Sequence, residues 1–200
     1  MISPMNTPLK PHPAPDPVYE RAAFTDGEFE NMIAKGAFAG LGRFELREGI
    51  IYRMNAQHAP HARAKMELAM ALRAAFAAAP GYEVVIEGSV RFGDGFSPEP
   101  DILVWRVGEA PKSFPGERVC LIVEVADSTL ADDLGAKRDL YARAGLPEYW
   151  VADLNARVIH QFADPVAGAY RKAAQAAFGA KVASLSQPAL VSDTAGLARL

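Results

Sequence analysis

Glu124 is an acidic residue inside a segment that otherwise favours a buried strand, and a buried carboxylate is a common component of metal sites. The run from Val119 to Val125 is almost wholly apolar around it, as is typical of a central strand. A carboxylate in such a place loses hydration, which is costly unless it is paired, protonated or bound to a metal. A Glu at the strand end that reaches water or an arginine is equally compatible with the pattern.

Asp101 is the second candidate, at the entrance of the apolar run Ile102 to Trp105. Pro100 favours an extended backbone at Glu99 and donates no ladder hydrogen bond, so the Asp101 carboxylate is expected at the mouth of a strand. Alone, an Asp in this place usually belongs to a turn. Two carboxylates on neighbouring strands are different, because Mg²⁺ usually binds through one or two carboxylates plus substrate phosphates.

Lys137 is the third candidate. Asp133 precedes it by four residues and Tyr141 follows it by four, so the three share one face of an expected helix. This helix begins just after the strand of Glu124 and must pack back on the sheet, which brings one of its faces beside the two acids. By spacing alone, an exposed Asp–Lys pair worth about a few tenths of a kcal/mol is the simpler interpretation.

The elements expected around these residues form an α/β domain. Thr25 and Glu28 have the spacing of a capping box and predict a short helix that ends near Gly36. Thr129 and Asp132 have the same spacing at the start of the helix that carries Lys137.

Periodicity and breakers predict a hairpin over 43–54, a helix over 61–79, strands over 82–87, 101–105 and 119–125, a helix over 129–144, a strand over 149–153 and a hairpin over 157–173. The order is helix, three strands, helix, strand, with β-rich additions at both ends. The tail beyond Ala183 has no clear pattern.

Composition indicates an ordinary globular protein. Of 200 residues, 50% are hydrophobic and 22% are charged, which is enough for one domain with a real core. We expect a Pro-rich extended arm over 1–23 and one domain over 24–200. No apolar run approaches a membrane span, the N-terminus lacks a signal-type apolar core, and the single Cys120 suits a small core residue. A cytoplasmic location is therefore expected.

The charge balance bears on the class of partner. The formal net charge is −3, whereas dedicated nucleic-acid binders carry clustered Lys and Arg. A nuclease remains compatible with this value, because an acidic metal site makes the metal-free protein more negative and bound ions offset part of that charge.

Three blocks of the sequence resemble the Uma-type restriction endonuclease family. The first is Phe44 to Ile51 with Met54 and His61, the second is Pro100 to Val104, and the third combines Leu121 to Thr129 with Asp133, Lys137, Tyr141 and Gly145 to Asp153. The resemblance covers about residues 24–162, and its third block is long and ordered. That family is similar to the PD-(D/E)XK nucleases, whose restriction-endonuclease-like core has the element order predicted above.

The resemblance implies roles for these residues. Asp101 matches the motif aspartate and Glu124 the motif acid. The parent pattern has a lysine two residues after the acid, where this chain has Ala126, and the resemblance implies that Lys137 replaces that lysine in space. The replacement of the motif lysine by Ala126 bears directly on whether the site is active.

The resemblance also implies two weaker candidates, Glu45 and His61, beside the acidic cluster. By pattern alone Glu45 is a solvated residue of the first hairpin, and His61 is a polar residue near a helix start.

The resulting hypothesis is a Mg²⁺- or Mn²⁺-dependent DNA endonuclease. Asp101, Glu124 and the backbone carbonyl of Val125 would hold the metal, and Lys137 would orient the attacking water or stabilise charge. Symmetric cutting of duplex DNA would favour a homodimer. Two alternatives stay open: a nuclease fold whose activity has decayed and which binds DNA or protein, and an unrelated metal-binding or structural protein.

Overall fold

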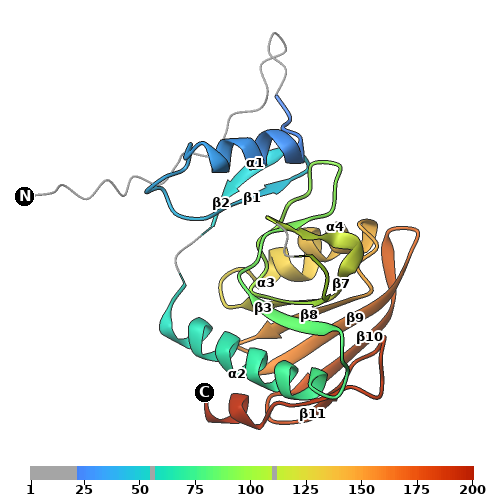
Figure 1. Cartoon of the computed structure of the whole chain (residues 1–200). Coiled ribbons are helices and arrows are strands. Elements are labelled where there is room, and N and C mark those ends of the chain that lie inside the picture. Colours follow the sequence, from blue (N-terminus) through green and yellow to red (C-terminus); the bar gives the residue numbers. More distant parts are fainter. Residues whose placement is uncertain (1–21, 55–56, 110–111) are drawn as a thin grey trace, which may run out of the picture.

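The computed structural model describes residues 22–54, 57–109 and 112–200. The expected Pro-rich arm over 1–23 lies almost wholly outside these ranges. Within them the architecture is mixed α/β, built on a six-stranded sheet with helices on both faces (Figure 1).

The sheet has the strand order β10-β9-β8-β7-β5-β3. Its strands are β3 (Tyr82–Ile86), β5 (Ile102–Arg106), β7 (Val119–Ala126), β8 (Glu148–Asp153), β9 (Val158–Val166) and β10 (Ala169–Ala177). Only the β7–β8 pair is parallel, and every other pair of this sheet is antiparallel. The helical segment after β7 is the crossover that a parallel pair requires.

Helix α2 (Ala59–Phe76) covers one face of the sheet. Its residues Leu68, Leu72 and Phe76 are buried there, as their helical spacing predicts. The C-terminal segment packs on the same face through β11 (Lys181–Ala183), β12 (Val191–Asp193) and a 3₁₀ turn (Ala195–Arg199). The tail without a clear pattern therefore completes the core, since two of its residues are fully enclosed there: Val182 and Leu197.

The opposite face is covered by a helical segment that differs from the single helix expected over 129–144. It consists of α3 (Leu130–Asp132), a π-helical turn (Asp133–Lys137) and α4 (Arg138–Arg143). Gly135 has non-helical dihedral angles, φ −112° and ψ −106°, which break the regular ladder. The predicted capping box at Thr129 is wrong, because its hydroxyl donates to Asp133 Oδ2 instead of capping the backbone.

A smaller layer stands beside the sheet. Helix α1 (Asp26–Ala34) begins with the predicted capping box of Thr25 and Glu28. The hairpin of β1 (Phe44–Arg47) and β2 (Ile50–Arg53) turns through Glu48 and Gly49. Both turn residues have positive φ, 50° and 76°, as a two-residue hairpin turn of the favoured type requires.

The remaining short elements are β4 (Val90–Arg91), β6 (Phe114–Pro115) and a 3₁₀ turn (Gly116–Arg118). Cys120 is partly buried and packs against the core, and burial raises the pKa of its thiol to about 12. Across the described ranges, no helix combines the length and hydropathy that crossing a membrane requires.

Candidate active site

The register of the sheet places the two acidic candidates opposite each other. Ile102 on β5 pairs with Val123 on β7, so the next positions outward along the ladder are Asp101 and Glu124. The backbone amide of Asp101 lies 3.4 Å from Glu124 Oε2, and the amide of Val125 donates to Asp101 Oδ2 at 2.9 Å. Asp101 is 6% and Glu124 4% exposed, so the interior holds two adjacent carboxyl groups.

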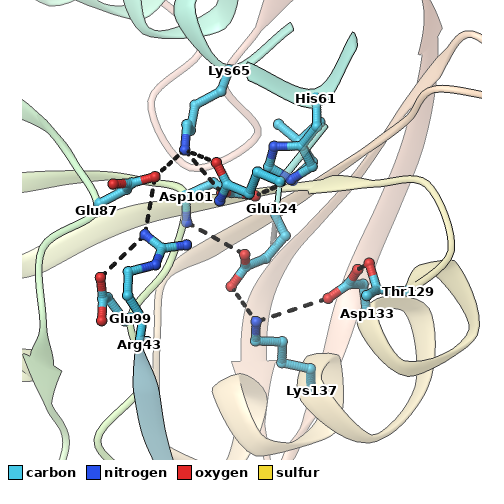
Figure 2. Close-up of polar contacts among 12 residues, drawn as sticks. Arg43, His61, Lys65, Glu87, Glu99, Asp101, Glu124, Thr129, Asp133 and Lys137 are labelled. Atoms are coloured by element: carbon cyan, nitrogen blue, oxygen red, sulfur yellow. Dashed lines mark hydrogen bonds and ion pairs between the residues drawn. The ribbon is translucent and has the colours of Figure 1, made fainter. Parts of the chain in front are cut away.

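Lys137 reaches these acids from the π-helical turn, and Figure 2 shows its side chain directed at Glu124. Its ammonium lies 2.8 Å from Glu124 Oε1 and 3.9 Å from both Glu45 Oε2 and Asp133 Oδ1. The Tyr141 hydroxyl also donates to Glu124 Oε1, at 3.0 Å. The expectation of an exposed Asp133–Lys137 pair is wrong, because both side chains are buried.

Burial governs the ionisation of this pair. Desolvation raises the pKa of Glu124, and repulsion from Asp101 and Asp133 adds to the effect, while the Lys137 ammonium opposes it. Desolvation by itself would lower the pKa of Lys137, but its acidic neighbours Glu124, Glu45 and Asp133 outweigh it and raise that pKa. The ammonium is therefore held in its charged form.

Helix α2 supplies a second set of contacts to Asp101. His61 Nε2 lies 3.1 Å from Asp101 Oδ2, and Lys65 Nζ lies 3.6 Å from Oδ1 (Figure 2). Gln57, just before the helix, donates to Asp101 Oδ1 at 2.9 Å and accepts from Lys65. Burial acts to raise the pKa of Asp101, but His61, the amide of Val125 and Lys65 together lower it.

Gln57 and Lys65 are absent from the sequence-based candidates. Lys65 follows His61 by four residues and therefore shares its helix face, which is the signal that points to it. Gln57 lies outside the regular elements, and nothing in its local pattern distinguishes it.

A cavity of about 340 Å³ opens beside these groups. The hairpin forms one wall, because residues alternate along β1 and its inward side chains Glu45 and Arg47 line the cavity, as does Arg43 just before the strand. Asp101, Glu124 and Lys137 line the interior together with His61 and Val125. Glu45 Oε2 is buried and has no hydrogen-bond partner among the described residues.

The donor set suits a hard divalent cation. No group of three or more His, Cys, Asp or Glu side chains is poised to hold a metal within the described ranges. Two carboxylates, with the backbone of Val125 at the cavity, match the sparse protein ligation of Mg²⁺, which keeps positions for water and substrate phosphate. Burial and the repulsion from Asp101 and Asp133 raise the pKa of Glu124. Glu45 Oε2 has no hydrogen bond within the described ranges and only the Lys137 ammonium nearby, at 3.9 Å. A cation would offset negative charge at this place.

A family model described as "Putative restriction endonuclease", named Uma2, matches residues 21–195. The chain belongs to the Uma2 family. No curated protein matches it. A solved structure from Anabaena variabilis, described as "a putative nuclease belonging to DUF820", has a TM-score of 0.67 and 18% identity, covering 87% of this chain and 97% of that one. The two share a fold.

In this Uma2 chain all five side chains selected from the sequence line one cavity: Glu45, His61, Asp101, Glu124 and Lys137. The alternative in which Glu124 reaches water or an arginine is wrong, since it is buried and its ion-pair partner is Lys137. Ala126, which stands at the motif lysine position, is fully buried in the core. The ammonium beside Glu124 thus belongs to Lys137 in the following helical segment. The chemical roles of Asp101, Glu124 and Lys137 stay predictions.

Proposed function

We propose that the chain is a divalent-metal-dependent DNA endonuclease that hydrolyses phosphodiester bonds. The observation that carries the proposal is the contact of Lys137 Nζ with Glu124, 2.8 Å apart, directly beside Asp101 in a solvent-connected cavity. Two buried carboxylates can hold a divalent cation, and an adjacent ammonium adds positive charge, so together they can stabilise the charge of a reacting phosphate.

Asp101, Glu124 and the backbone carbonyl of Val125 would hold Mg²⁺ or Mn²⁺. When bound, the cation supplies a water of lowered pKa and offsets negative charge on the reacting phosphate. The protein contributes the fixed positions of both carboxylates, because strand pairing holds their backbones and the amide of Val125 holds Asp101 Oδ2. His61 and Gln57 hold the other side of Asp101.

Lys137 acts as a cation and a hydrogen-bond donor in this mechanism. Its raised pKa excludes it as a general base near neutral pH. Its ammonium orients Glu124 and stabilises negative charge that develops on the phosphate oxygens. Arg53 is exposed on the same cavity wall and would bind a neighbouring backbone phosphate.

Cleavage by the wild-type protein is the direct test of the function. We expect supercoiled plasmid and linear DNA to be cut with Mg²⁺ or Mn²⁺ and to stay intact with EDTA, because the carboxylates alone provide no activated water. Product analysis on gels, with single-stranded DNA included, measures this. Absence of cleavage under all these conditions would support a decayed nuclease fold that only binds its partner.

Metal-linked stability tests the cation site without requiring activity. A cation that binds only the folded protein stabilises it by about 2.7 kcal/mol at a hundred times its Kd. We therefore expect the melting temperature to rise with Mg²⁺ or Mn²⁺ in the wild type and not in Glu124→Ala. Glu117→Gln, which alters an exposed acid away from the cavity, is the matched control and should respond as the wild type does. An equal response in Glu124→Ala would place the cation elsewhere.

A further inference from the structure

Tyr52 is an exposed aromatic residue on the wall of the cavity. It lies on β2 with 44% of its surface exposed, and it lines the cavity that contains Asp101 and Glu124. Its cross-strand partner is Glu45, so both side chains project from the same side of the hairpin. The ring therefore lines the same cavity as the carboxylates, on the side of the hairpin that carries Glu45.

Packing does not account for this position. Within the described ranges every other aromatic residue is buried or partly buried, and Tyr52 alone is exposed. The aromatic residues of the same layer pack on one another instead: Phe38 stacks on Phe44 with ring centroids 4.4 Å apart. Because Tyr52 makes no such ring contact among the described residues, its exposed ring on the cavity wall is available to a ligand.

The ring of Tyr52 is held by a fixed cation. The guanidinium carbon of Arg47 lies 5.4 Å from the ring centroid, within the range of a cation–π contact. Arg47 in turn is anchored by Glu45 and by Asp132 Oδ2, at 2.6 Å from its Nη1. A ring whose position is already restrained loses little freedom when a flat ligand stacks on it.

The surroundings of the ring favour a nucleic-acid strand. Arg43 and Arg53 line the same cavity. Arg43 is already paired with Glu87 at 2.9 Å and with Glu99 at 3.2 Å. The exposed Arg53 is therefore the arginine available to a backbone phosphate. Aromatic rings interleaved with arginines are the elements by which proteins hold unpaired strands, because every base presents a flat face. Asp101 and Glu124 are only 6% and 4% exposed, so a phosphate must enter the cavity to reach them, which an unpaired strand does more readily than a closed duplex.

We propose that Tyr52 is a stacking platform for a base of an unpaired DNA strand, with its ring held by Arg47 and with Arg53 on the wall of the same cavity. The inference rests on the proposed nuclease function for the presence of DNA, and it specifies that function: the substrate enters as a single strand or a locally unpaired segment. Tyr52 binds the substrate and takes no part in the proton transfers.

The test measures binding without cleavage. Fluorescence anisotropy in EDTA compares the affinity of the full chain for a labelled oligodeoxythymidine of about 12 nucleotides, within the site sizes of single-strand grooves, with that for the same strand in a duplex. The variants are Tyr52→Ala, Tyr52→Phe and Met70→Ala. Met70 is exposed on α2 and does not line the cavity, so it controls for loss of an exposed apolar side chain.

Tyr52→Ala is expected to weaken single-strand binding on the order of tenfold, as alanine substitution of stacking residues does, while Tyr52→Phe and Met70→Ala retain the wild-type affinity. Duplex binding should change little in all three. An unchanged affinity in Tyr52→Ala, an equal loss for duplex, or a loss in Tyr52→Phe would each overturn the stacking role. The binding measurement needs no metal and no turnover. A wild-type protein that binds the single strand but does not cleave DNA would therefore refute the nuclease function and leave the stacking role of Tyr52 intact.

Discussion

Neutralising either buried carboxylate is expected to abolish metal-dependent cleavage. Asp101→Asn and Glu124→Gln preserve side-chain shape but remove the charge that would hold the cation. The loss should be at least about 10²- to 10³-fold, the usual consequence of deleting one electrostatic group from an active site. Cleavage rates on plasmid DNA with Mg²⁺ measure it. Asp127→Asn, an exposed acid that lines the same cavity, is the matched control and should keep most activity.

The same two variants are expected to differ in stability. Asp101 accepts from His61, Gln57 and the amide of Val125, and its pKa is lowered on folding. A lowered pKa means that the ionised form stabilises the fold at neutral pH and that this contribution is lost as the pH falls. Asp101→Asn should therefore destabilise the metal-free protein.

Glu124→Gln should change stability little, since burial raises the pKa of Glu124 and disfavours its charge. The Lys137 ammonium is not left uncompensated in this variant, because it keeps Glu45 Oε2 and Asp133 Oδ1 at 3.9 Å. Urea unfolding in EDTA measures both variants. Cleavage that persists unchanged in Glu124→Gln would indicate a contaminating nuclease and remove the support for this site.

Replacing Lys137 alone is expected to be the most destabilising change at the site. Its buried ammonium faces Glu124, Glu45 and Asp133, and removing one partner of a buried ion pair costs about 3–5 kcal/mol, because the remaining charge is left without compensation. Lys137→Met retains most of the side-chain volume, so the free energy of unfolding reports the charge and not a cavity. Lys172→Met, at an exposed lysine on β10, should change it little.

A second substitution tests whether the destabilisation by Lys137→Met comes from the charge on Glu124. Adding Glu124→Gln to Lys137→Met removes the uncompensated charge and should restore a large part of the stability, because buried ion pairs are often replaceable by neutral groups. The two single variants and the double variant form a double-mutant cycle. If the two changes in the free energy of unfolding are strictly additive, Lys137 and Glu124 do not interact in solution. The proposal that Lys137 orients Glu124 would then be wrong.

Cleavage and metal binding together should distinguish the acid variants from the lysine variant. Lys137→Met should lose cleavage but keep the melting shift with Mg²⁺, because a protonated lysine is not a metal ligand. Loss of that shift would assign Lys137 an unexpected role in holding the cation.

Most of the sheet and helix α2 could be predicted from the sequence, because their signals are local. Apolar runs define β5 and β7, and the 3.6-residue period of Leu68, Leu72 and Phe76 defines the buried face of α2. The capping box of Thr25 and Glu28 involves neighbours within one turn and was predicted for the same reason. The family resemblance then singled out Asp101, Glu124 and Lys137, which line one cavity.

The helical segment after β7 shows where local periodicity is insufficient. The same spacing that predicted a continuous helix also predicted a Thr129 cap, yet Gly135 leaves helical geometry and Thr129 contacts the Asp133 side chain. The side chain of Lys137 leaves this irregular turn toward Glu124, a tertiary contact that local spacing does not report. The C-terminal tail likewise has no clear pattern of its own and is ordered by the core that it completes.

The sequence by itself determined the class of fold, through the spacing of residue types along the chain, and its resemblance to a family singled out Asp101 and Glu124 as candidate site acids. Only the tertiary structure decided their environment. It set Asp101 opposite Glu124 through strand register, brought Lys65 and Gln57 to Asp101, and exposed Tyr52 beside Arg47. These contacts join segments that are far apart in the sequence. They depend on burial and on charge compensation, and both of these are properties of the whole folded chain.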